Sequence, residues 1–130
     1  MNKEFTSVGK DIEIRIGEFR ITNIACVDVS KDGAKVITKP VKYGLGIEKR
    51  CKKTNPDEED KFYVIGFVKW DAKNEDVMYE DVGMRTFEEL NAHLFADFKE
   101  LVLIASKLVG MAYCYDVRMA NAYEDDYDEN

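Results

Sequence analysis

The chain has 130 residues, a formal net charge of −7 and a hydrophobic fraction of 45%. This length and composition are typical of a single globular domain, and they exclude a largely disordered chain. The acidic balance also argues against unaided wrapping of duplex DNA, which needs a net basic surface. No apolar run approaches the roughly 18 residues that span a bilayer, and three widely spaced cysteines do not form a disulfide framework. We therefore expect a cytoplasmic protein with reduced thiols and no membrane contact.

The negative charge is concentrated at the C-terminal end of the sequence. Residues 123–130 contain five carboxylates and no basic residue, and the rest of the chain carries a formal charge of only −2. A run of like charge usually stays solvated and often acts as an interaction tail. We expect one domain over residues 1–122 and an acidic tail over residues 123–130. The five carboxylates are Glu124, Asp125, Asp126, Asp128 and Glu129.

The N-terminal half of the chain predicts β-strands. Isoleucines alternate with charged residues over 12–16, and a second apolar run follows over 19–29. The pair Asp32-Gly33 favours a hairpin turn, after which residues 34–39 return as a strand. Residues 44–60 show no hydrophobic period and have turn residues at both ends, so we expect a long exposed loop there.

Two further strands are expected before the helical part of the chain. Residues 61–70 are almost continuously aromatic or β-branched, which predicts the strongest strand in the sequence. Residues 77–84 predict a weaker strand that pairs back on it. A final alternating stretch, residues 111–119, predicts a short last strand.

One long helix is predicted between these strands. The segment 86–89 has the sequence of a capping box, and apolar residues then recur at spacings of three and four. Gly110 stands where a glycine commonly ends a helix, so the helix should cover about residues 87–109. The sequence thus predicts an α+β fold: a mostly antiparallel sheet of five to six strands packed against one long helix, followed by a short final strand and the acidic tail.

No pattern in the sequence identifies a catalytic centre. His93 is the only histidine, and neither a metal-binding spacing of histidines and cysteines nor a phosphate-binding glycine loop is present. A pairing of His93 with a cysteine stays open, because sequence alone does not give distances. Cys51 lies among cations that favour its thiolate, whereas Cys26 and Cys114 are expected in the core. We expect a protein that is not an enzyme and holds no cofactor and no metal.

Basic and aromatic residues occur together around the strand at 61–70. Exposed aromatic rings beside a cationic loop can stack bases and hold phosphates of a single strand. Tyr63 and Trp70 have opposite parity, so only one of them can face an open surface if the strand is regular. Phosphates would be contacted by four cations, namely Lys49, Arg50, Lys52 and Lys53.

The order of elements resembles that of known single-strand binders. A strand ending in the Trp-Asp pair at 70–71, a polar turn, a short strand with Val-Gly-Met at 82–84 and a capped helix from Thr86 follow one another. This order is similar to the β-β-β-β-α plan of Whirly proteins and of transcriptional coactivators of the positive cofactor four type, over about residues 11–108. The resemblance implies binding of single-stranded DNA, although the final strand and acidic tail depart from that plan.

Two functions are therefore compatible with the sequence. The first is a non-enzymatic protein of nucleic-acid metabolism that binds single-stranded DNA or RNA through the basic loop and an aromatic sheet face. The alternative is an acidic interaction or inhibitor module, which mimics nucleic acid and binds a basic surface of a protein partner through the carboxylates of residues 123–130. Homo-oligomer formation stays open in both cases.

Overall fold

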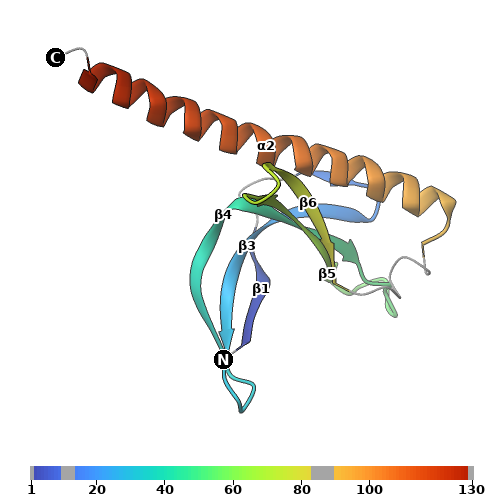
Figure 1. Ribbon diagram of the computed structural model, residues 1–130. Coiled ribbons are helices and arrows are strands. Elements are labelled where there is room, and N and C mark those ends of the chain that lie inside the picture. Colours follow the sequence, from blue (N-terminus) through green and yellow to red (C-terminus); the bar gives the residue numbers. More distant parts are fainter. Residues whose placement is uncertain (1, 10–13, 83–89, 129–130) are drawn as a thin grey trace.

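The computed structural model describes the backbone of residues 2–9, 14–82 and 90–128, and the side chains of these residues except 2–3, 9, 38–40 and 123–128. The described residues form six strands and one long helix (Figure 1). The elements are β1 (Asn2–Gly9), β2 (Arg15–Ile16), β3 (Phe19–Val29), β4 (Lys35–Arg50), β5 (Phe62–Asp71), β6 (Asp76–Asp81) and α2 (Ala92–Asp128).

The strands form one antiparallel sheet in the order β1-β3-β4-β5-β6, and β2 pairs with the first residues of β3. The helix α2 lies across one face of this sheet (Figure 1). The predicted α+β class, with a mostly antiparallel sheet and one long helix, is confirmed. The strand β1, which pairs with residues 23–29 of β3, was not predicted from the sequence.

The β3–β4 hairpin agrees with the sequence only in part. The turn at Asp32-Gly33 is confirmed, since Gly33 has a φ of 86° and the Ser30 amide donates to the Ala34 carbonyl at 2.9 Å. The exposed loop predicted over 44–60 is wrong in its first half, because β4 continues to Arg50. Residues 44–50 of β4 pair with β5 on one edge and mostly with β3 on the other. This pairing on both edges stabilises a strand although the sequence shows no clear apolar pattern.

The main core lies between α2 and the sheet. From α2, Leu101 and Ala105 are fully buried, and Phe98 and Val109 nearly so. They meet apolar side chains of β3, β4 and β5. The predicted apolar face of the helix is therefore confirmed, although Leu90, Leu94 and Leu108 are only half-buried. The sheet residues of this core are Phe19, Ile21, Leu45, Ile47, Ile65 and Val68.

A β-bulge in β5 decides which side chains face the helix. Ile47 of β4 pairs with Gly66 and the next residue pairs with Val64, so Ile65 is an extra residue in β5. The bulge reverses the alternation, and both Tyr63 and Trp70 pack on the helix side. The expected separation of these two residues by parity is wrong for this reason.

The face of the sheet away from α2 is strongly curved. The rings of Phe5 on β1 and Phe67 on β5 have centroids 5.5 Å apart, although two strands lie between β1 and β5 in the sheet. In a flat sheet these strands would be about 14 Å apart. Between Asn23 and Ala25 the register of β4 shifts from Leu45 to Pro40, and such irregularities bend a sheet. The bend lets the two rings meet.

The helix α2 has different limits from those predicted. It begins at Ala92, where the side-chain oxygen of Asn91 accepts a hydrogen bond from the Leu94 amide at 3.0 Å, as in an N-cap. The predicted capping box at 86–89 lies outside the described residues. The helix continues through Gly110 to Asp128, so the predicted helix end and the predicted final strand at 111–119 are wrong.

Gly110 lies within α2 and does not end it. A Cβ atom at Gly110 would lie 3.6 Å from Cγ2 of Val77, an ordinary van der Waals distance, so the helix packs against strand β6 here without requiring a glycine. Tyr113 and Asp116 then continue the sheet-facing side of α2 at spacings of four and three from Val109. These contacts hold residues 111–116 in the helix although their sequence alternates like a strand.

We expect Leu101→Ala to lower the free energy of unfolding by about 2–5 kcal/mol, because it leaves a cavity between α2 and the sheet. Urea denaturation followed by circular dichroism would measure this loss. Leu103→Ala is the matched control, since Leu103 is 56% exposed on the same helix and its loss should stay within about 0.5 kcal/mol. Equal losses in the two variants would contradict the described helix orientation.

Candidate functional site

The four cations predicted to contact phosphates lie where β4 ends and the following turn begins. Arg50 Nη2 lies 3.4 Å from Glu18 Oε1, and Lys53 Nζ lies 3.1 Å from Asp60 Oδ1. Asp60 also pairs with Arg15 at 3.3 Å, and Lys53 and Arg15 together lower the pKa of the Asp60 carboxyl. Nearby carboxylates therefore offset much of the positive charge. The four residues are Lys49, Arg50, Lys52 and Lys53.

The structure does not bring the two predicted stacking residues together. Tyr63 pairs with Lys49 across β4 and β5, but it packs against the main core. Trp70 lies seven residues further along β5, which is about 23 Å in an extended strand. The indole ring of Trp70 is stacked on the ring of Tyr113, with centroids 4.0 Å apart and an interplanar angle of 14°. One face of the only tryptophan is thus covered by the helix.

Trp70 belongs to a cluster that we call the junction, formed by Tyr43, Trp70, Tyr113 and Asp116. The rings of Tyr43 and Tyr113 meet edge to face with centroids 5.3 Å apart, and the Tyr43 hydroxyl donates to Asp116 Oδ2 at 2.7 Å. Lys42 Nζ lies 3.2 Å from the same carboxylate oxygen. The hydrogen bonds from Tyr43 and Lys42 lower the pKa of Asp116. The junction ties α2 to the middle of β4 and to the end of β5.

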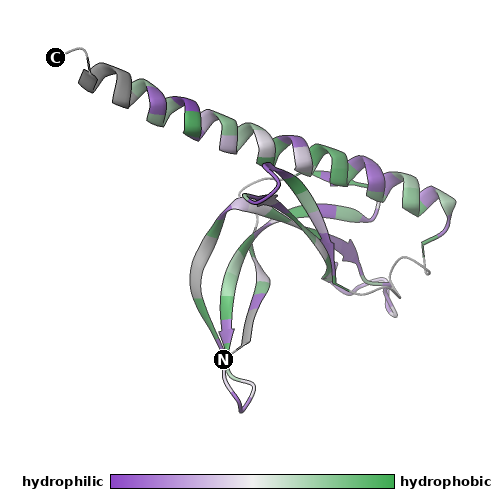
Figure 2. Ribbon diagram, viewed as in Figure 1, coloured by the Kyte–Doolittle hydropathy of each residue, from purple (hydrophilic) through white to green (hydrophobic). Residues whose placement is uncertain are grey.

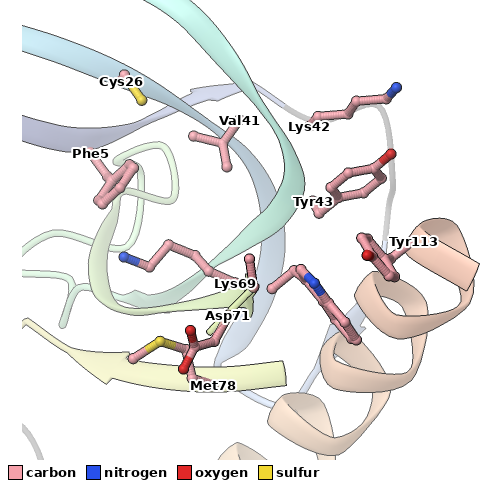
Figure 3. Close-up of a pocket in the computed structure, with 11 residues that line it drawn as sticks. Phe5, Cys26, Val41, Lys42, Tyr43, Lys69, Asp71, Met78 and Tyr113 are labelled. Atoms are coloured by element: carbon pink, nitrogen blue, oxygen red, sulfur yellow. The ribbon is translucent and has the colours of Figure 1, made fainter. Parts of the chain in front are cut away.

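A hollow of about 700 Å³ lies beside the junction (Figure 3). Its wall is mainly apolar and includes Phe5, Val41 and Met78, and the Cys26 side chain lies at its edge in Figure 3. The charged side chains around it are engaged. Lys69 pairs with Glu80, Lys42 with Asp116, and Asp71 accepts from the Lys73 amide at 3.0 Å. The hollow thus presents an apolar surface, and the charged side chains around it are held in ion pairs and hydrogen bonds within the protein.

The other candidate reactive residues are dispersed. His93 is 85% exposed at the start of α2, and its Nε2 atom lies 3.6 Å from Asp97 Oδ2. Cys51 is half-buried, and Cys114 is exposed on α2, so its expected core position is wrong. Within residues 2–9, 14–82 and 90–128, no group of three or more histidine, cysteine, aspartate and glutamate side chains could hold a metal ion.

The sequence did not predict that α2 projects past the sheet (Figures 1 and 2). Asp116 is the last residue of α2 in the junction, and every residue from 117 to 122 is exposed. We call residues 117–128 the helix extension, and its length is about 18 Å. Its last six residues belong to the segment expected as an acidic tail, and their backbone continues the helix. Glu129 lies outside the described residues.

Comparisons with known proteins give no family. No protein-family model, no curated protein and no solved structure matches the chain. The resemblance to single-strand binders therefore stays a prediction. In the described part of the chain, no helix is both long and apolar enough to cross a membrane.

The junction should make stability depend on pH. Because the pKa of Asp116 is lowered in the folded state, its carboxylate stabilises the fold above the ordinary pKa of 3.8, and this contribution is lost as the pH falls through the lowered value. We expect Asp116→Asn to reduce the melting temperature near pH 7 and to have a progressively smaller effect as the pH falls below 3.8 and through the lowered pKa of Asp116. Tyr43→Phe is the matched variant, since it removes the 2.7 Å hydrogen bond and leaves the carboxyl of Asp116 in place. An effect of Asp116→Asn that is the same at neutral and at acidic pH would contradict this role.

Proposed function

We propose that this protein is a non-enzymatic interaction module that presents the acidic end of its long helix to a basic surface of a protein partner. The observation that carries the proposal is the helix extension. A rigid helix that ends in carboxylates and stands clear of the sheet suits docking into a complementary groove. The exposure of residues 117–122 supports this use of the extension.

The electrostatics of the helix end support a cationic partner. The last turns of α2 contain Glu124, Asp125, Asp126 and Asp128, and no basic residue lies in the last turn. The carbonyl end of a helix carries partial negative charge, so each carboxylate near it is unfavourable by about 0.3–1 kcal/mol. Cations of a partner would relieve this repulsion on binding. The proposed partner is therefore a protein with a cluster of lysine or arginine residues, such as a groove that otherwise holds nucleic acid.

Binding of single-stranded DNA or RNA stays a prediction with weaker support. It would rely on the cations at residues 49–53, two of which form ion pairs, and on Trp70, whose ring stacks on Tyr113. If that function holds, labelled single strands bind at low salt, with a slope of about −0.7 per neutralised phosphate. Replacement of the four cations by Ala would then flatten the salt dependence.

The decisive variant changes Glu124, Asp125 and Asp126 to the corresponding amides. We expect this variant to lose about tenfold or more in affinity for the basic partner, because three charge-assisted contacts disappear. The partner is first identified by cross-linked capture with the full chain, and binding is then measured by calorimetry with the purified partner across a salt series.

The matched control carries the same charge change elsewhere on the surface. Asp57, Glu58 and Glu59 are exposed in the turn before β5, and their amide variants should bind the partner as the native chain does. Equal losses in both triple variants would show only a general effect of net charge and would contradict the proposal. Salt-dependent binding of single-stranded DNA or RNA that requires the four cations at residues 49–53, without capture of any basic protein partner, would also contradict the proposal.

A further inference from the structure

A row of apolar side chains runs along one side of α2. Its first two members, Ile104 and Leu108, pack partly against the main core, and the following members are exposed. The spacings along this row are four, three, four, four and three, so its members share one side of the helix. The residues in the middle are highly exposed: Met111 by 68%, Tyr115 by 63% and Met119 by 45%. We call this row the apolar seam. Its members are Ile104, Leu108, Met111, Tyr115, Met119 and Ala122.

The seam differs from the rest of the exposed helix surface. Leu103 and Val117 are also exposed, but polar or small residues such as Ser106 and Gly110 lie between them on their side of α2. The seam instead follows the spacing of a helix–helix interface over about 27 Å. A continuous apolar row of this length on a surface helix marks an interaction site.

We propose that the apolar seam binds a second copy of this chain, so that two α2 helices pack antiparallel around a twofold axis near Tyr115. The inference goes beyond the proposed function, because it concerns another partner and another side of the helix. A seam that meets its own copy forms a closed, self-complementary interface, and this is the commonest symmetry of protein dimers.

The distribution of charge along α2 identifies a second copy as the occupant and sets its direction. Lys107 and Arg118 are exposed next to the seam, whereas the carboxylates of α2 are concentrated at 124–128. In an antiparallel pair centred near Tyr115, residues 123–128 of one helix run beside residues 102–107 of the other. This places the acidic segment of each copy near the partner copy's basic side chain at position 107. A parallel pair would place the two acidic segments side by side, which is unfavourable.

The fold leaves room for this pair. The last contact of α2 with its own sheet among the described side chains is that of Asp116, and residues 117–122 beyond it are exposed. In the antiparallel arrangement, the extension of each copy lies beside the sheet-covered half of the other helix. The two sheets then lie at opposite ends of the helix pair (compare the position of α2 in Figure 1). Each extension thus gains a neighbour along the seam without displacing the junction.

Sedimentation equilibrium of the full chain tests the inference. We expect a concentration-dependent dimer, and Tyr115→Asp should raise its dissociation constant about tenfold or more, because a carboxylate would lie unpaired between two apolar seams. Val117→Asp is the matched control, since Val117 is 39% exposed on the extension but lies off the seam. Circular dichroism should show equal helix content in the two variants.

Zero-length carbodiimide cross-linking of mixed labelled and unlabelled chains tests the direction of the helices. The expected product links Lys107 of one copy to a carboxylate within residues 124–128 of the other. A monomer at all concentrations would overturn the inference, as would a dimer weakened equally by Tyr115→Asp and Val117→Asp. A dimer without the expected cross-link would overturn the antiparallel arrangement. The amide variants at 124–126 leave only Asp128 for the cross-link within residues 124–128, so they should form less of it but keep the apolar contact. Failure of the dimer and failure of basic-partner binding therefore remain distinguishable.

Discussion

The contact between α2 and the face of the sheet that carries Phe19, Ile47 and Val68 is the constraint on which the rest of the structure depends. Leu101 and Ala105 of α2 have no exposed surface in this contact. A fully buried large apolar side chain contributes about 1.5–3 kcal/mol relative to an exposed one, so this layer provides much of the stability of a chain this small. The contact also fixes the direction of α2, and hence the side on which the helix leaves the sheet.

The parts of the fold that could be predicted from the sequence are those in which local pattern and tertiary packing agree. The hairpin turn at Asp32-Gly33 and the apolar face around Leu101 follow from turn chemistry and from helical spacing. Gly110 illustrates the opposite case. Its position after an apolar stripe favours a helix end, but in the structure the helix continues through it. The local pattern did not reveal this, because the helix is held there by contacts of Tyr113 and Asp116 with residues far away along the chain.

The charged residues of the candidate site could be predicted from the sequence, but their positions in space could not. The carboxylates at 124–128 are evident in the sequence, but their position on a rigid helix depends on Tyr113 and Asp116, whose contacts with Trp70 and Tyr43 lie far apart along the chain. The basic cluster shows the same limit. Glu18 lies 32 residues before Arg50, and only the pairing of β3 with β4 brings the two side chains together. Ion pairs between distant segments offset a charge that looks concentrated in the sequence.

The stacking of Trp70 on Tyr113 gives the molecule an optical consequence. Trp70 is the only tryptophan in the chain, and it lies at the edge of the main core, near the point where the helix passes beyond the sheet. Its fluorescence therefore comes from a single position, and one face of its ring is covered only while α2 is packed on β4 and on the end of β5. Detachment of this part of the helix would change the tryptophan emission while leaving most of the far-ultraviolet signal intact. The chain thus carries its own spectroscopic probe of helix docking, independent of global unfolding.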